Sequence, residues 1–513
     1  MPPMPARPSR PFAPLAAIDM GSNSFRLEIA QLPHGHYRRM TYLKETVRLG
    51  GGLDADGRLT ESAAHRGLEC LARFAQQLRG FEPGNVRAVA TQTLREAKNR
   101  DDFLVDAQRV LGFPIEVISG REEARLIYAG VAYLQPSNRP RLVIDIGGRS
   151  TELILGEGRV ARVAESFQVG SVSLSQRWFD DARFTPHAFR HAQIAAGAEL
   201  EEALDTFSSD RWEVALGSSG TVGAVSALLA ANGITDGRIT PDALRWCILR
   251  CLDAGSVDRL TLPGIGDDRK PIIGGGLALL YTLLTHFGIE TLWPAKGALR
   301  QGVIIELHQR LSGRQRAGGA DLRDDTVAEL QRRFDANVAH AARVRSVALP
   351  LFESTMPRAG EAAWRELGWA CDVHEIGLMV SHHDHHRHSA YLMGHVDAPG
   401  FSQNQQRRVA NLVLGQRGGL RKIEPGLADL QFAWQVLALR LAVIKCHARG
   451  PTDPKALHLR RDGHSALLDF STGWAESHPR TVHLLREEAE RWAERARNDL
   501  PNPIRIRLPN VVA

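Results

Sequence analysis

"RLVIDIGGRSTELILGEGR", residues 141–159, repeats a pattern that the chain already contains at residues 15–31, "LAAIDMGSNSFRLEIAQ". Aligned without a gap, the two stretches share Asp19 with Asp145, Gly21 with Gly147, Ser24 with Ser150, and Leu27 with Leu153. In each copy a glycine-containing loop joins two β-branched runs, which predicts a hairpin rather than the strand–helix start of a Rossmann unit. The sequence therefore predicts two similar lobes, each with one such hairpin.

The repeated loop, Asp-x-Gly-x-x-Ser, has the composition of an anion site. Glycine lets backbone N–H groups approach an anion closely, successive amides form a concave anion site, and the serine hydroxyl is a further donor. An aspartate at the strand end repels phosphate but can hold a divalent cation that binds it. We expect the two loops to grip one phosphate chain from both sides; the alternative is a pair of ordinary glycine turns.

A third stretch, "VALGSSGTVGAV" at residues 214–225, runs from a strand into a helix. Glycines and hydroxyls at the start of a helix favour another anion or nucleotide site, here formed by Ser219, Gly220 and Thr221.

Composition limits the classes of protein that fit. A chain of 513 residues with 43% apolar residues suits two to four domains. No apolar run approaches the roughly 18 to 20 residues of a membrane helix. The opening residues 1–13 lack the apolar stretch of a signal peptide and are expected to be a disordered tail. Five scattered cysteines favour a reducing cytoplasm, and Cys247 with Cys251 favour core packing over a metal site.

The charge balance points to an anionic ligand. The net charge is +6 and the pI is about 9.2, and arginine, which predominates among the basic residues, suits phosphate well. We find no basic stretch interleaved with aromatic residues, so nucleic acid is not expected as a partner.

The pattern of the chain predicts an α/β front half followed by two further domains. Short β-branched runs alternate with amphipathic helices, then a Gly-rich linker follows at residue 312, and residues beyond it are mostly helical. The predicted boundaries are 14–126 for the first lobe, 127–311 for the second, 325–448 for an all-α domain, and 455–513 for a small α+β domain.

Five motifs carry a family resemblance: "AAIDMGSNSFRLEIA", "ATQTLREAKN", "IEVISGREEARLIYAGV", "VIDIGGRSTELILG" and "ALGSSGT". They resemble the exopolyphosphatase / guanosine pentaphosphate phosphohydrolase family of the actin-like phosphotransferase superfamily. "RHSAYLMGHVDAPGFSQNQQ" resembles the long, four-domain bacterial members. The resemblance implies two actin-like (ribonuclease-H-like) lobes, and a Mg²⁺-dependent exopolyphosphatase that releases terminal orthophosphate from inorganic polyphosphate. The alternative is removal of the 5′-phosphate of guanosine pentaphosphate at the same site.

The resemblance also implies site residues. Adjacent helical residues point about 100° apart, so only one of Glu122 and Glu123 can face a cleft. Glu123 aligns with the family's catalytic glutamate and is expected to accept a proton from the attacking water. The expected Mg²⁺ ligands are Asp19, Asp145 and Glu152, and K⁺ is a candidate activator. The expected phosphate contacts are Asn23, Ser24, Arg95, Gly147, Gly148, Arg149, Ser150, Ser219, Gly220 and Thr221, with Arg48 as a weaker candidate.

Arg149 departs from the family pattern, which usually has glycine at this position. If the position needs a positive φ, arginine would add strain of about 1 kcal/mol or more. If it does not, Arg149 could add a phosphate contact.

The histidines of the all-α domain resemble those of the HD phosphohydrolase fold, whose ligands are a His, a His-Asp pair and a later Asp. Here His340 and the pair His374-Glu375 are present, but the later stretch "LALRLAVIK" at residues 437–445 offers no aspartate, so we expect an HD-like fold that is degenerate as a metal enzyme. The resemblance to long exopolyphosphatases implies instead a basic passage that holds a long polyanion and favours processive digestion. Its expected residues are His382, His386, Arg387 and His388.

Three other functions compete with this interpretation: a kinase of the same superfamily, an HD-type nucleotide hydrolase whose front half senses a ligand, and a non-catalytic phosphate-binding regulator. Glu123 argues against the regulator, and the motifs favour the phosphatase branch over the kinases. The resemblance further implies a cytoplasmic homodimer, with peripheral association to the inner membrane face as an additional possibility.

Overall fold

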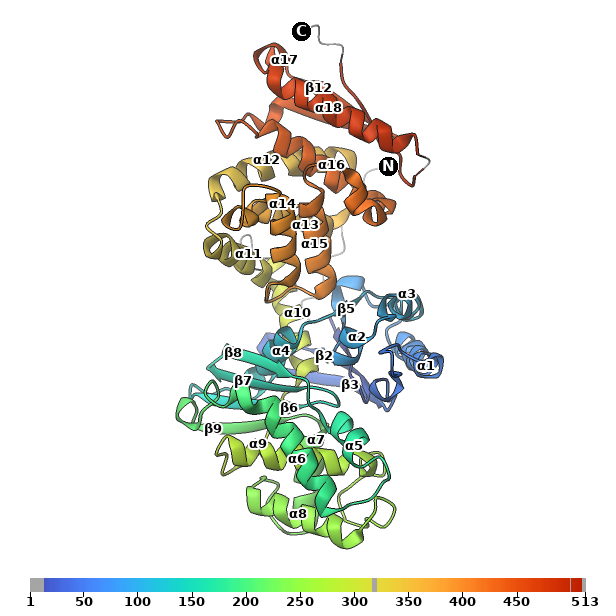
Figure 1. Cartoon of the computed structure of the whole chain (residues 1–513), viewed down its shortest axis with the longest axis vertical. Coiled ribbons are helices and arrows are strands. Elements are labelled where there is room, and N and C mark those ends of the chain that lie inside the picture. Colours follow the sequence, from blue (N-terminus) through green and yellow to red (C-terminus); the bar gives the residue numbers. More distant parts are fainter. Residues whose placement is uncertain (1–12, 316–320, 499, 510–513) are drawn as a thin grey trace. The chain divides into compact units, whose positions relative to one another are not determined.

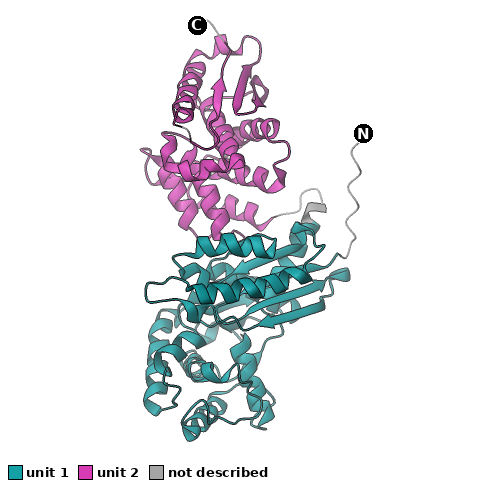
Figure 2. Cartoon of the chain, turned by 90° about the vertical axis from the view of Figure 1, so that its right-hand side faces the viewer, with its two compact units in different colours: residues 1–319 teal, residues 320–513 magenta. Residues whose placement is uncertain are grey.

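The computed structural model describes residues 13–315, 321–498 and 500–509, which form two compact units, residues 1–319 and 320–513 (Figure 2). The expected disordered tail lies outside the described residues except for residue 13, and so does the middle of the expected linker, residues 316–320.

The first unit contains two five-stranded sheets (Figure 1). One sheet has the order β3-β2-β1-β4-β5, with β1 (Leu15–Met20), β2 (Phe25–Gln31), β3 (Arg38–Glu45), β4 (Val86–Ala90) and β5 (Ile115–Val117). The other has the order β10-β9-β6-β7-β8, with β6 (Arg141–Ile146), β7 (Thr151–Glu157), β8 (Val160–Phe167), β9 (Val214–Ser218) and β10 (Leu292–Pro294).

The two sheets have the same topology. In each, the first three strands pair antiparallel, and the first strand also pairs parallel with the fourth, which pairs parallel with the fifth. Even the register shift is repeated, between Ile29 and Ala30 in β2 and between Leu155 and Gly156 in β7, which are matching positions of the two copies. The predicted duplication of lobes is confirmed.

Helices cover both faces of each sheet. Those of the first unit are α1 (Glu61–Gln77), α2 (Gln92–Glu96), α3 (Arg100–Leu111), α4 (Gly120–Leu134), α5 (Ser171–Trp178), α6 (Pro186–Leu200), α7 (Gly220–Ala231), α8 (Pro241–Ala254), α9 (Ile273–His286) and α10 (Leu299–Gln315). Side chains alternate across β1: Ile18 packs with α1 and α3, whereas Ala17 packs with α4 and α10.

Helices α4 and α10 lie between the two sheets and bury residues of both in one core, for example Ala17 of β1 and Val143 of β6. The predicted lobe boundary between residues 126 and 127 falls inside α4, because this helix continues to Leu134 as part of that shared core. Cys247 and Cys251 are buried, as predicted, in the core on the face of the second sheet that is opposite α4 and α10.

The second unit combines a helical bundle with a three-stranded sheet, β11-β12-β13. Its elements are α11 (Leu322–Arg333), α12 (Val338–Thr355), α13 (Gly360–Val373), α14 (His385–His395), α15 (Gln403–Gly415), α16 (Leu430–Lys445), β11 (Leu457–Asp462), β12 (Ser465–Phe470), α17 (Trp474–Ser477), α18 (Pro479–Ala496) and β13 (Arg505–Arg507). One core contains both Trp434 of α16 and Trp492 of α18, so the expected third and fourth domains form one compact unit. Among the described residues, no helix is long and apolar enough to cross a membrane.

Candidate active site

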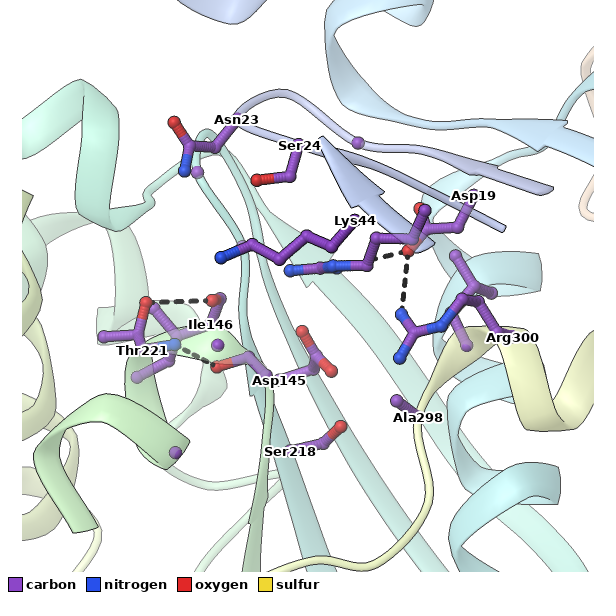
Figure 3. A pocket seen from close by; sticks show the side chains of 18 of the residues that line it. Asp19, Asn23, Ser24, Lys44, Asp145, Ile146, Ser218, Thr221, Ala298 and Arg300 are labelled. Carbon is purple, nitrogen blue, oxygen red and sulfur yellow. Dashed lines mark hydrogen bonds and ion pairs between the residues drawn. The ribbon is translucent and has the colours of Figure 1, made fainter. Parts of the chain in front are cut away.

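The two repeated loops of the first unit face each other across one cavity of about 590 Å³. They approach so closely that a Cβ at Gly148 of the second loop would lie 3.2 Å from the Cβ of Ser22 in the first. A larger residue at position 148 would push the loops apart. Figure 3 shows Asn23, Ser24 and Lys44 of the first lobe facing Asp145 and Thr221 of the second.

Most of the predicted site residues line this cavity: Asp19, Asn23, Ser24, Glu123, Asp145, Gly147, Gly148, Ser150, Ser219, Gly220 and Thr221. The structure thus brings together residues as far apart in the chain as Asp19 and Thr221. Arg95, Arg149 and Glu152 do not line the cavity.

The two hairpins differ in the residue opposite the aspartate. In the first hairpin, Asp19 faces Arg26 across the strands and forms ion pairs with Arg26 at 3.2 Å and with Arg300 of α10 at 3.3 Å. The carboxylate of Asp19 is therefore balanced by two guanidinium groups that themselves line the cavity.

In the second hairpin, Asp145 faces another acid, Glu152. Burial raises the pKa of Asp145 above its usual range, although a hydrogen bond from Ser218 opposes the shift. Burial, together with the charges of Glu123 and Asp145, also raises the pKa of Glu152, which accepts a hydrogen bond of 2.8 Å from Ser166. Like charges directly opposite one another destabilise a sheet, so this hairpin favours a bound cation.

Helix α4 positions the predicted catalytic glutamate. The Ser119 side chain accepts a hydrogen bond from the Glu122 N–H and so caps the helix. As predicted, the two glutamates diverge: Glu122 pairs with Arg125 at 2.8 Å on the buried side, whereas Glu123 lines the cavity. Glu123 also pairs with Arg95 at 2.8 Å.

The surroundings of Glu123 raise its pKa to about 7. Burial is the largest cause, and the nearby carboxylates of Asp19 and Asp145 add to it, while Arg95 opposes the shift. A carboxyl group that titrates near neutral pH is suited to accept a proton from water during a reaction.

The start of α7 forms the third wall of the cavity. Ser219 has a φ of 105°, a conformation that L-residues rarely adopt, and its side chain accepts hydrogen bonds from the N–H groups of Thr221 and Val222. Those two amides are therefore already paired. Arg269 packs so closely over Gly220 that a Cβ there would lie 2.2 Å from a guanidinium nitrogen.

Several cations that the sequence analysis did not select also line the cavity: Arg26, Arg39, Lys44, Arg269, Lys296 and Arg300. Lys44 forms an ion pair of 2.9 Å with Asp268, which links the first lobe to the second at the cavity. Only Arg26 lies inside a motif that pointed to the site; the others come from β3, from the loops around β10 and α9, and from α10.

Arg149 does not have a positive φ, so the strain considered above is absent. Its side chain forms an ion pair with Glu96 at 2.8 Å and donates a hydrogen bond to the carbonyl of Gly50, instead of reaching the cavity. Arg95 is likewise held by Glu123 and Gln92. The exposed Arg48 lines a neighbouring cavity that shares Ser22 and Asn23 with the first.

The expected polyphosphate passage in the second unit is only partly assembled. His386 and Arg387 line a cavity of about 430 Å³ that also contains Lys422, but His382 and His388 do not line it. Burial and the charge of Lys422 lower the pKa of His386 to about 4, so this ring is neutral near pH 7 and adds no positive charge.

Two actin-like lobes that enclose a cavity rich in cations and glycine loops, with Glu123 among the carboxylates on its wall, define a phosphate-cleaving enzyme. The profile of the Ppx/GppA phosphatase family matches residues 28–311, and the profile of Ppx/GppA phosphatase domain III matches residues 322–489. The chain belongs to the Ppx/GppA phosphatase family and is a hydrolase of phosphoanhydride bonds.

Two relatives resemble the chain along most of its length. A protein of Aeromonas hydrophila named guanosine-5′-triphosphate,3′-diphosphate pyrophosphatase is 36% identical over 489 residues, which cover 93% of this chain and 96% of the relative. A protein of Aeromonas salmonicida with the same name is 34% identical with the same coverage.

Solved structures resemble the first unit. An exopolyphosphatase-like protein matches with a TM-score of 0.53 and 25% identity, covering 59% of this chain and 100% of its own. An exopolyphosphatase from Cytophaga hutchinsonii matches with the same TM-score and 23% identity, covering 58% of this chain and 98% of its own, and supports the fold.

Proposed function

We propose that the chain hydrolyses guanosine 5′-triphosphate 3′-diphosphate to guanosine 5′-diphosphate 3′-diphosphate and orthophosphate. One observation carries the choice of substrate: both relatives named for this compound align over 93% of the chain, including both compact units. Polyphosphate, which the sequence analysis placed first, is the alternative substrate.

The cavity has the components that cleavage of a terminal phosphate needs. Amides and hydroxyls of the two repeated loops donate hydrogen bonds to the oxygens of the 5′-triphosphate. Arg26, Lys44 and Arg300 neutralise the charge of these oxygens. Glu123 accepts a proton from the attacking water while the oxygen of that water bonds to the terminal phosphorus. The bond to the bridging oxygen breaks, and the shortened nucleotide leaves with the electron pair of that bond.

The donor set at the cavity fits Mg²⁺, which prefers hard oxygen ligands. Asp19 and Asp145 line the cavity, and Glu152 lies opposite Asp145 across the hairpin, although these three carboxylates do not form one group of three ligand atoms. Mg²⁺ usually binds one or two carboxylates together with water and substrate phosphates. We therefore assign Asp145, with Glu152 or Asp19, as its protein ligands; the ion would neutralise charge that develops on the phosphate oxygens.

The test compares substrates at equal concentrations of terminal phosphate. The full chain is incubated with Mg²⁺ and guanosine 5′-triphosphate 3′-diphosphate, with long polyphosphate, or with GTP, and orthophosphate and nucleotide products are measured. We expect guanosine 5′-diphosphate 3′-diphosphate and orthophosphate to form in equal amounts. We also expect the largest kcat/KM for guanosine 5′-triphosphate 3′-diphosphate. A larger kcat/KM for polyphosphate would reverse the choice of substrate. Homodimer formation, peripheral membrane association and K⁺ activation stay predictions.

A further inference from the structure

A second group of polar side chains lies in the second unit, among residues that the proposed reaction does not use. His340 of α12 and the neighbours His374 and Glu375, which follow α13, each present one ligand atom, and these three atoms all lie within 4.8 Å of one another. Nε2 of His340 is 3.9 Å from Oε1 of Glu375. All three residues are at least nine-tenths buried.

Each member of the group has a buried polar atom without a hydrogen-bond partner: Nδ1 of His340, Nε2 of His374 and Oε2 of Glu375. Buried polar atoms are almost always paired, because an unpaired one loses its hydration without compensation. Three unpaired atoms on side chains that converge therefore indicate that something polar binds among them.

Other contacts already orient two of these side chains. Nδ1 of His374 lies 2.7 Å from the carbonyl oxygen of Cys371, and because a carbonyl can only accept, this nitrogen must carry the proton. Nε2 of His374 is then the unprotonated nitrogen, the form that binds metals. Arg449 donates to Oε1 of Glu375, which leaves Oε2 as the unpaired oxygen.

We propose that His340, His374 and Glu375 bind one divalent transition-metal ion of the Zn²⁺, Mn²⁺ or Fe²⁺ class. Two imidazoles and one carboxylate suit such ions, whereas Mg²⁺ prefers oxygen ligands alone. Ligand atoms about 2.1 Å from a tetrahedral metal lie about 3.4 Å apart, so atoms that now lie within 4.8 Å of one another need to approach by at most about 1.4 Å. The proposal concerns binding and so agrees with the expectation that this domain is degenerate as a metal enzyme.

The site is independent of the proposed function, because every group assigned to the hydrolysis lies between residues 19 and 301. A competing occupant is an ordered water molecule, which also satisfies two to four polar partners in a buried space. If a metal ion occupies the site, the protein retains metal, and this retention depends on the three side chains. If water occupies it, neither holds.

The experiment uses the full chain without a histidine tag. The protein is purified without chelator and its metals are counted by mass spectrometry; separately, Co²⁺ is added to chelator-treated protein and its visible absorption is recorded. We expect about one transition-metal ion per chain and a Co²⁺ spectrum of imidazole and carboxylate ligation.

Variants assign the metal to the site. His340→Gln and His374→Gln are expected to lower metal affinity at least tenfold. The matched control is His383→Gln, a side chain of the same histidine-rich region that is 93% exposed and should leave metal binding unchanged. If a histidine variant does not fold, Glu375→Gln, which keeps the shape of the side chain, replaces it as the test of the site. No retained metal and no Co²⁺ spectrum, or equal binding by all variants, would overturn the proposal and leave water as the occupant.

Discussion

Glu123 is the residue on which the chemistry of the proposed reaction depends. It lines the cavity, and the substitution Glu123→Gln removes its capacity to accept a proton while keeping its shape. We expect kcat to fall about 10²- to 10⁴-fold, the usual contribution of a general base, with little change in substrate affinity. The control is Glu165→Gln, which removes an ion pair with Arg121 at the start of the same helix. Unchanged turnover in Glu123→Gln would exclude the assignment.

The pKa of Glu123 also predicts the acid limb of the pH–rate profile, the range in which the rate falls as the pH is lowered. A base must be ionised, so with a pKa of about 7 the rate should fall tenfold per pH unit below neutrality and level off above it. Arg95 stabilises the ionised form, and Arg95→Gln should therefore move this limb to higher pH. Stopped assays of kcat/KM from pH 5 to 9, which reports the pKa of the free enzyme, locate the limb and its displacement in the variant. A limb that stays in place in Arg95→Gln would show that another group controls it.

At the scale of single residues, the sequence indicated most of the cavity residues that lie in a motif, although not Arg26, and missed those outside the motifs. Asp19, Asn23 and Asp145 belong to the repeated loop, whose composition already indicates an anion site. Lys44 and Arg300 come from elements without a motif, and they reach the cavity only because of how β3 and α10 pack. Arg149 could not be placed from sequence, since its partner Glu96 lies in a different motif.

At the scale of elements, the second hairpin predicts a link between pH, Mg²⁺ and stability. Folding raises the pKa values of Asp145, Glu152 and Glu123, so between about pH 4 and 7 the folded chain keeps protons that the unfolded chain releases. The free energy of unfolding should therefore fall as pH rises through this window. A bound cation offsets the repulsion of the ionised groups, so Mg²⁺ should raise the Tm of the first unit more at pH 8 than at pH 5.5.

Calorimetry at the two pH values, with and without Mg²⁺, measures this difference. Mg²⁺ at about 100 times its Kd should add about 2.7 kcal/mol at pH 8. Asp145→Asn should remove most of the response, whereas Asp253→Asn, which changes an exposed carboxylate of α8, should keep it. An equal response to Mg²⁺ in both variants would place the cation elsewhere.

The burial of the strands explains why some of them were not predicted from the sequence. Strands with buried residues on both faces, such as β1 and β6, have continuous apolar runs and were predicted correctly. By contrast, β3 and β8 are edge strands whose side chains are mostly exposed or half-buried, so their sequences do not show a strand pattern. The duplication would have indicated both, because each follows its hairpin in the same topological position.

At the scale of the whole chain, the sequence predicted the change from α/β to helical structure but not the shared cores. Because α4 and α10 pack against both sheets, the first unit is one body with two lobes rather than two separate domains. Trp434 and Trp492 share one core in the same way in the second unit. Such sharing depends on which helix faces meet, which patterns within single segments do not encode.

The separation into two units predicts that the first can act alone. The exopolyphosphatase-like structure corresponds over its entire length to 59% of this chain, so a chain of that size is sufficient for the fold. Every cavity residue assigned above lies before residue 302, and the first unit has cores of its own. We therefore expect a chain that ends at Gln315 to fold and to release orthophosphate from guanosine 5′-triphosphate 3′-diphosphate with kcat within about tenfold of the full chain. Circular dichroism verifies folding, and the same truncation with Glu123→Gln is the inactive control. A folded but inactive truncation would show that the second unit contributes to the reaction itself.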